Sequence, residues 1–201
     1  MSPEHLILAG GGHAHALLLL RWAMYPRRRP FGLITLINRN STTIYSGMVP
    51  GLIAGKYTLD EATINLRFLA DRAGVALVVA EINGLDPVRN CVFLENRPSI
   101  YFTRLSLDVG SVTFGDGAIL KDRKTGHMPS IRPLEKALNW LVKQDEEAFR
   151  DPSTPFVITG AGFAGVEVAL ALRKRWAMRP LLLQAHLCQP IPQLKKALDI
   201  A

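Results

Sequence analysis

The chain has 201 residues, of which 48% are hydrophobic and 20% are charged, and its net charge is +7. This length can bury a core in one domain or in two small ones, and the composition is that of an ordinary globular protein. Every apolar run is shorter than the roughly 18 residues that a membrane span needs. The positive charge favours anionic ligands, but no basic, aromatic-rich motif indicates nucleic-acid binding.

The cysteine content argues against several kinds of site. Cys91 and Cys188 are the two cysteines, and they form no C-x-x-C or C-x-x-x-x-C pair. This pattern supplies neither a zinc framework nor a redox dithiol, and it fits a reducing cytoplasm. The N-terminus has no basic region before its apolar stretch, so we expect no secretory signal and a cytoplasmic protein.

The chain begins with a predicted strand, a glycine turn and a helix. Leu6–Ala9 is apolar, Gly10 and Gly12 match the first two glycines of a G-x-G-x-x-G motif, and His15 replaces the third. Such a turn exposes backbone N–H groups and the positive end of the helix dipole to a diphosphate. We expect His15 to push the helix slightly away from the strand. A packing or turn role for His13 and His15 is favoured over metal binding, because no Cys, Asp or Glu cluster accompanies them.

Alternating strands and helices follow. An amide, Asn38, stands at the end of the second strand, where an acidic residue usually binds a ribose. The elements predicted after the first helix are a strand at Leu33–Ile37, a helix at Asp60–Ala73 ended by Gly74, a strand at Val75–Ile82, a hairpin of Asn90–Glu95 and Ser99–Phe102, and a strand at Leu105–Gly110.

A second strand, turn and helix repeat the first after 150 positions. Thr113–Pro133 is rich in Gly, Asp, Lys and Pro and is predicted to be a linker, and Pro133–Phe149 is predicted to be an amphipathic helix. Phe156–Thr159 then precedes a complete G-x-G-x-x-G motif with Gly160, Gly162 and Gly165. Gln184 follows the next strand and would not repel a 2′-phosphate. The repeat therefore predicts two dinucleotide-binding units of the α/β class.

Five motifs resemble the pyridine nucleotide–disulphide oxidoreductase superfamily of flavoproteins. Within it, the sequence is most similar to the type II NADH dehydrogenase-like branch and to the oxidoreductase module associated with selenide, water dikinase. The motifs are Gly10–His15, Tyr45–Gly51, Ala80–Asp86, Leu107–Ser111 and Gly160–Glu167.

The resemblance implies a fold and a set of binding residues. It implies a Rossmann-like FAD-binding domain with a parallel sheet and a β-hairpin insertion at 1–112, a linker at 113–132, and the start of a Rossmann-like NAD(P)-binding domain at 133–201. The residues that it assigns are Gly10, Gly12, His13 and Ala14 at the FAD diphosphate, Asn38 at the ribose, Glu81 and Ile82 at the adenine, Ser46, Gly47, Met48, Pro50, Asp108 and Gly110 beside the flavin ring, and Gly160, Gly162, Gly165 and Glu167 at NAD(P)H.

The resemblance also implies an activity, in which hydride passes from NAD(P)H to FAD and then to a quinone-like acceptor. No protein nucleophile is evident, and the missing C-x-x-x-x-C argues against a disulphide reductase. Chains of the superfamily are longer, so we expect an N-terminal part of a longer enzyme, whose full-length parent makes peripheral membrane contact. Two alternatives stay open. One is a non-catalytic nucleotide-binding fragment. The other is a sulfide:quinone oxidoreductase, for which Cys91 and Cys188 are expected to be structural instead of reactive.

Overall fold

The computed structural model describes residues 4–111, 131, 134–150, 153, 156–160, 162–177 and 180–184. The chain divides into two compact units, which are described separately. The first comprises Met1–Val49 and Thr58–Ala137, and the second comprises Pro50–Tyr57 and Leu138–Ala201. Apart from Ile131, the predicted linker at 113–132 lies outside the described residues, and the predicted domain limits stay a prediction.

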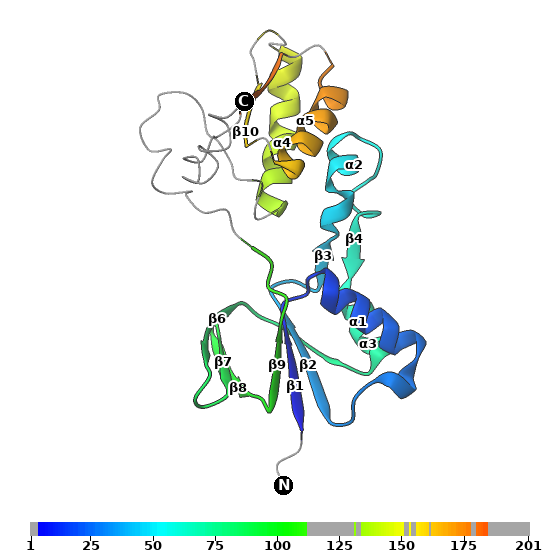
Figure 1. Ribbon diagram of the computed structural model, residues 1–201, viewed down its shortest axis with the longest axis vertical. Coiled ribbons are helices and arrows are strands. Elements are labelled where there is room, and N and C mark those ends of the chain that lie inside the picture. Colours follow the sequence, from blue (N-terminus) through cyan, green and yellow to red (C-terminus); the bar gives the residue numbers. More distant parts are fainter. Residues whose placement is uncertain are drawn as a thin grey trace, which may run out of the picture. The chain divides into compact units, whose positions relative to one another are not determined.

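The first unit is built on a four-stranded parallel sheet. Its strands are β1 (His5–Ala9), β2 (Leu33–Asn38), β5 (Ala76–Val79) and β9 (Arg104–Leu107), in the order β5-β2-β1-β9. Figure 1 shows β1 between β2 and β9. The chain moves outward from β1 to β5 and then returns to the other side of β1. In open parallel sheets, ligands bind at the carboxyl ends of the strands where the order reverses in this way. The topology therefore places the expected ligand site after β1.

Different elements cover the two faces of this sheet. Adjacent residues of a strand point to opposite faces. Leu8 packs with α1 (His13–Met24) and α3 (Leu66–Ala73), whereas Ile7 packs against an antiparallel sheet. That sheet consists of β6 (Ile82–Asp86), β7 (Cys91–Leu94) and β8 (Arg97–Tyr101). The predicted α/β fold, with a parallel Rossmann-like sheet and a β-hairpin insertion, is confirmed.

The helix predicted from Asp60 begins six positions later. Thr63–Asn65 forms β4, which pairs with β3 (Thr42–Ile44) in an antiparallel ribbon. Asn65 then caps α3, because its side-chain Oδ1 accepts a hydrogen bond from the Phe68 N–H at 2.9 Å. Gly74 ends the helix as predicted, with a φ of 64°.

The single strand predicted at Val75–Ile82 is wrong, since the chain changes sheets there. The Ala80 N–H still binds the Asn38 carbonyl at 2.9 Å, and Ile82 then begins β6 on the antiparallel sheet. The predicted hairpin is present as β7 and β8. The strand predicted at Leu105–Gly110 ends early, at Leu107. Besides β3 and β4, the short elements that were not predicted are the 3₁₀ turns η1 (Pro26–Arg28) and η2 (Ser46–Met48), and α2 (Val49–Ile53).

The second unit repeats the strand, turn and helix. It contains most of α4 (Leu134–Arg150), followed by β10 (Phe156–Thr159), α5 (Phe163–Arg175) and β11 (Leu181–Gln184). β10 and β11 are parallel, as the repeat predicts.

A charged cluster joins three segments of the second unit. Asp145 on α4 accepts hydrogen bonds from the Arg175 guanidinium and from the Trp176 indole N–H, the latter at 2.8 Å. Arg175 also donates to the carbonyl of Ile53 in α2 at 2.9 Å. These contacts attach α2 to α4 and α5.

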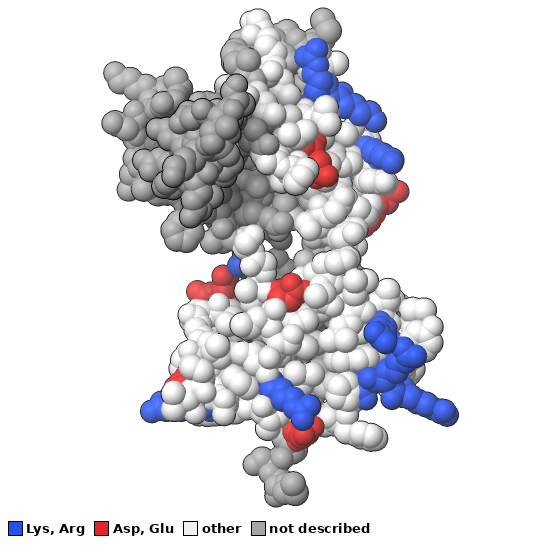
Figure 2. All heavy atoms as spheres, viewed as in Figure 1, with Lys and Arg blue, Asp and Glu red and all other residues white. Residues whose placement is uncertain are grey.

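The surface carries its charge in small groups. Figure 2 shows Lys and Arg side chains in separate groups on each unit, among a mostly uncharged surface. In the part of the chain that the structure describes, no helix is both long and apolar enough to cross a membrane.

Candidate nucleotide-binding site

The turn after β1 is closely packed between β2 and β9. Gly10 has a φ of 90°, and its N–H binds the Ile37 carbonyl at 2.8 Å. A Cβ at Gly10 would lie 2.2 Å from the carbonyl oxygen of Asp108, so a side chain is excluded there. The Gly12 N–H binds that same Asp108 oxygen at 3.2 Å. The two glycines therefore let the turn pass directly against the end of β9.

Two backbone amides in the first turn of α1 have no hydrogen-bond partner in the part of the chain that the structure describes. Gly12 is the N-cap, and Gly11 N–H is already bound by Asn38 Oδ1 at 2.8 Å. His15 N–H is bound by Asp108 Oδ2 at 3.0 Å. Between them, the N–H groups of His13 and Ala14 have no hydrogen-bond partner among the described residues. Free amides in the first turn, together with the helix dipole, form an anion-binding site.

The two histidines of the turn have different environments. His15 is 3% exposed, and its ring binds the Gly10 carbonyl at 2.7 Å and Ser106 Oγ at 2.8 Å. It therefore has the packing and turn role that the sequence favours. His13 is exposed and stacks on Tyr45, with ring centroids 4.7 Å apart and an interplanar angle of 17°.

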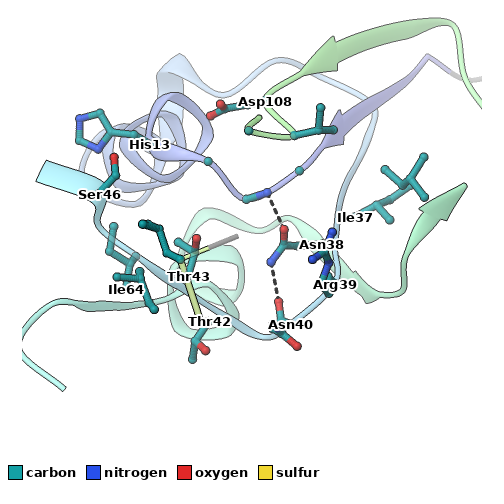
Figure 3. A pocket seen from close by; sticks show the side chains of 18 of the residues that line it. His13, Ile37, Asn38, Arg39, Asn40, Thr42, Thr43, Ser46, Ile64 and Asp108 are labelled. Carbon is teal, nitrogen blue, oxygen red and sulfur yellow. Dashed lines mark hydrogen bonds between the residues drawn. The ribbon is translucent and has the colours of Figure 1, made fainter. Parts of the chain in front are cut away.

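A pocket of about 380 Å³ opens beside the glycine turn (Figure 3), which is within the size range of small-molecule sites. His13 and Ser46 lie at one side of the view, and Asn38 and Arg39 lie at the other. The site residues expected from the sequence that line this pocket are Gly10, Gly12, His13, Asn38, Ser46, Glu81, Ile82, Asp108 and Gly110.

The remaining residues expected at the first site do not line the pocket but are near its lining residues in the sequence. Ala14 contributes the second free amide of α1, Gly47 and Met48 belong to η2 together with Ser46, and Pro50 lies in α2 of the second unit. Their roles beside a flavin stay predictions.

Asn38 holds the turn with both ends of its side-chain amide. Oδ1 accepts from Gly11 N–H, and Nδ2 donates to the Asn40 carbonyl at 2.8 Å (dashed lines in Figure 3). Next to it, Arg39 forms an ion pair with Glu81 at 3.2 Å, and both residues line the pocket. The expected contact of Asn38 with a ribose stays a prediction.

Sequence reasoning did not single out Arg39 or Tyr45 as site residues. Arg39 directly follows the ribose-side position of β2, and this placement in the chain was a usable signal. Tyr45 stands in a Gly- and Pro-rich segment that favours a turn, and only the paired strands β3 and β4 bring it against His13.

The turn of the second unit is tighter than that of the first. Gly160 has a φ of 112°, and Gly162 is the N-cap of α5. A Cβ at Gly165 would lie 1.8 Å from the Gly160 carbonyl oxygen, whereas the matching position in the first unit holds the whole side chain of His15. The first unit thus accommodates a side chain at a position where the second admits only glycine, and the expected displacement of the first helix from its strand stays a prediction. Glu167 is exposed on α5.

No protein-family model and no curated protein sequence matches the chain. Solved structures do match it in fold. The sulfide:quinone oxidoreductase of the hyperthermophilic bacterium Aquifex aeolicus is 21% identical, with a TM-score of 0.66 over 89% of this chain and 42% of that one. NDH2 of Plasmodium falciparum, solved in complex with NADH, is 16% identical, with a TM-score of 0.65 over 90% of this chain and 41% of that one.

A ferredoxin reductase of Rhodopseudomonas palustris is 18% identical, with a TM-score of 0.63 over 98% of this chain and 47% of that one. The chain thus spans less than half the length of each of these proteins. At these identities the likeness establishes the fold, that of flavoprotein reductases with a Rossmann-like FAD-binding domain.

Proposed function

We propose that the first unit binds FAD and that the chain is the flavin-binding part of an NAD(P)H oxidoreductase. The observation that carries this proposal is the pair of free amides on His13 and Ala14, in the first turn of the helix that follows the pocket-lining residues Gly10–Gly12. Two adjacent donors at a helix N-terminus match the oxygens of a diphosphate. The shared fold with flavoprotein reductases supports the same conclusion.

The residues of the pocket fit the parts of FAD. Gly10 and Gly12 bring the backbone close enough for a diphosphate to reach the amides. The end of β2 and the start of β6 would hold the adenosine, and Ser46 with its neighbours would face the flavin ring. One feature opposes the fit, since the carboxylate of Asp108 already binds the third amide of α1. Two amides are left for the ligand.

The second turn is the proposed site of NAD(P)H. Gly160, Gly162 and Gly165 would bind its diphosphate, with Glu167 nearby on α5. A bound flavin would supply the redox chemistry, that is, acceptance of a hydride from NAD(P)H and transfer of the two electrons to a quinone-like acceptor. The chain contributes the backbone amides that would bind the phosphates of each nucleotide.

The test is a titration of the purified full chain with FAD, followed by anaerobic addition of NADH or NADPH. We expect one flavin per chain and loss of the visible flavin absorption on reduction. Addition of a soluble quinone should restore the absorption. Failure to bind FAD would refute the flavin site, and bound flavin that neither NADH nor NADPH bleaches would refute the oxidoreductase activity and support a non-catalytic nucleotide-binding module.

A sulfide:quinone oxidoreductase is the second candidate, favoured by the fold match to the Aquifex aeolicus protein. It requires an accessible thiol. Cys91 is 2% exposed within β7, which argues against this role, and Cys188 lies outside the described residues. Reduction of the bound flavin by sulfide, lost in Cys188→Ser, would favour it over NAD(P)H oxidation.

A further inference from the structure

The ribose end of the pocket has an unusual arrangement of charge. In dinucleotide-binding units, an acidic residue at the end of the second strand binds the ribose hydroxyls, and an arginine there accommodates a 2′-phosphate instead. Here the position holds Asn38, whose Oδ1 and Nδ2 already bind Gly11 and Asn40. The side chain at the usual ribose-binding position therefore holds the glycine turn through these two hydrogen bonds.

A charged pair beside Asn38 brings one acidic and one basic side chain to this end of the pocket. Arg39 Nη2 lies 3.2 Å from Glu81 Oε1, and both side chains line the pocket. Two carboxylates appear among the lining residues that the structure describes. Asp108 stands at the glycine turn, whereas Glu81 stands at the junction between β5 and β6, opposite the end of β2. Glu81 is therefore the carboxylate at the ribose end.

We propose that the Arg39–Glu81 ion pair selects nucleotides whose adenosine 2′-hydroxyl is free and rejects those that carry a 2′-phosphate. The inference rests on the proposed nucleotide site. Glu81 keeps one oxygen available to accept a hydrogen bond from a ribose hydroxyl, and its charge repels a 2′-phosphate. Arg39 holds Glu81 in place and, while paired, is not free to bind that phosphate.

Because the Arg39–Glu81 pair is exposed, its contribution to nucleotide selectivity can be tested by substitution without unfolding the chain. The side chains are 57% and 46% exposed, and an ion pair so open to water contributes little to stability. Removing Glu81 should therefore leave the fold intact and free the Arg39 guanidinium. A guanidinium is well suited to bind phosphate, because its fork of N–H donors matches the phosphate oxygens.

The test is calorimetric titration of the full chain with ADP and with 2′-phospho-ADP, which differ only at the 2′ position. We expect the wild type to bind ADP at least tenfold more tightly. Glu81→Gln should shift the ratio of the two affinities by about tenfold or more toward 2′-phospho-ADP. In the double variant Arg39→Gln, Glu81→Gln, this gain should disappear, because it requires the freed guanidinium.

Glu4→Gln is the matched control. It removes a carboxylate from the Arg104–Glu4 pair, which has a similar length of 3.3 Å and side chains 70% and 62% exposed, but which does not line the pocket. It should leave the affinity ratio unchanged.

Three outcomes would overturn the inference. These are an unchanged ratio in Glu81→Gln, a gain that persists in the double variant, and no binding of either nucleotide. A ratio that responds to residues 39 and 81 in a chain that does not bind FAD would support the inference and refute the proposed flavin site. The two ideas can thus fail separately.

Discussion

The carboxylate of Asp108, just after β9, accepts a hydrogen bond from the backbone N–H of His15 in the first turn of α1, at 3.0 Å. The two residues are 93 positions apart in the chain. Asp108 thus caps a helix to which it does not belong. It also places a negative charge beside the two amides proposed to bind a diphosphate.

Asp108→Asn should strengthen FAD binding. The amide oxygen can still accept from His15 N–H, but the charge that repels the diphosphate is gone. We expect a roughly three- to tenfold lower Kd, the range that a change of about 1 kcal/mol covers, measured by quenching of flavin fluorescence. Asp108→Ala removes the cap as well, and should lower the free energy of unfolding by about 1 kcal/mol. Weaker FAD binding in Asp108→Asn would contradict the proposed repulsion between the Asp108 carboxylate and the diphosphate.

His15 should be required for stability even though a glycine completes the motif. His15→Ala leaves the Gly10 carbonyl and Ser106 Oγ without their ring partner, and we expect a loss of about 2–4 kcal/mol in urea unfolding followed by circular dichroism. Ser106→Ala, which removes one of the two bonds, should cost less. His15→Gly restores G-x-G-x-x-G but should be a further ~1 kcal/mol less stable than His15→Ala, because glycine disfavours a helix. Wild-type stability of His15→Gly would refute this role.

Two glycine substitutions in the second turn should have different effects on folding and on nucleotide binding. Gly165→Ala forces a Cβ to within 1.8 Å of the Gly160 carbonyl, so the turn must distort and NAD(P)H binding should be lost. Gly162→Ala meets no atom within 4 Å, and the φ of −72° at Gly162 suits any residue. It should therefore leave unfolding unchanged but weaken NADH or NADPH binding, since its methyl group stands where the diphosphate approaches. Unaltered nucleotide binding in both variants, measured by calorimetry, would exclude this turn as the site.

The second unit should lose stability in acid through Asp145. The hydrogen bond from Arg175 is the main cause that lowers the pKa of this carboxyl, with the Trp176 indole adding to it against the opposing effect of burial. A lowered pKa in the folded chain means stability that is present above the ordinary carboxyl pKa and lost as the pH falls through the folded value.

Asp145→Asn should therefore reduce the free energy of unfolding at pH 7 by about 1–2 kcal/mol, a modest figure because the carboxylate is 37% exposed. The difference from wild type should shrink as the pH falls toward 3, as urea unfolding followed by tryptophan fluorescence would show. Glu4→Gln, in an exposed pair, should change unfolding by less than about 0.5 kcal/mol at either pH. A difference that stays constant with pH would contradict the assignment.

Local patterns in the sequence predicted the elements whose causes are local. The apolar run before Gly10 and the helical run after it form β1 and α1, and the same pattern recurs at Gly160. Gly74 ends its helix because only the left-handed conformation fits there. The glycine turns and nine of the 22 residues that line the pocket were expected from these signals together with the resemblance.

Elements that depend on distant partners were missed or misplaced. Thr63–Asn65 reads as the start of a helix and becomes a strand because it pairs with Thr42–Ile44. The run from Val75 to Ile82 is uniformly apolar until Glu81, so no local signal marks where the chain leaves one sheet for the other. The contacts of His15 with Ser106 and Asp108 join residues that no sequence window contains.

These long-range contacts also set the order in which the phosphate site can form during synthesis. Gly12 and His15 are synthesised before their partners at Ser106 and Asp108, which follow more than 90 positions later in the chain. At about 5–20 residues per second, roughly 5–20 seconds separate the two events. During that interval a nascent chain carries its glycine turn without the strand β9 that packs against it in the folded unit.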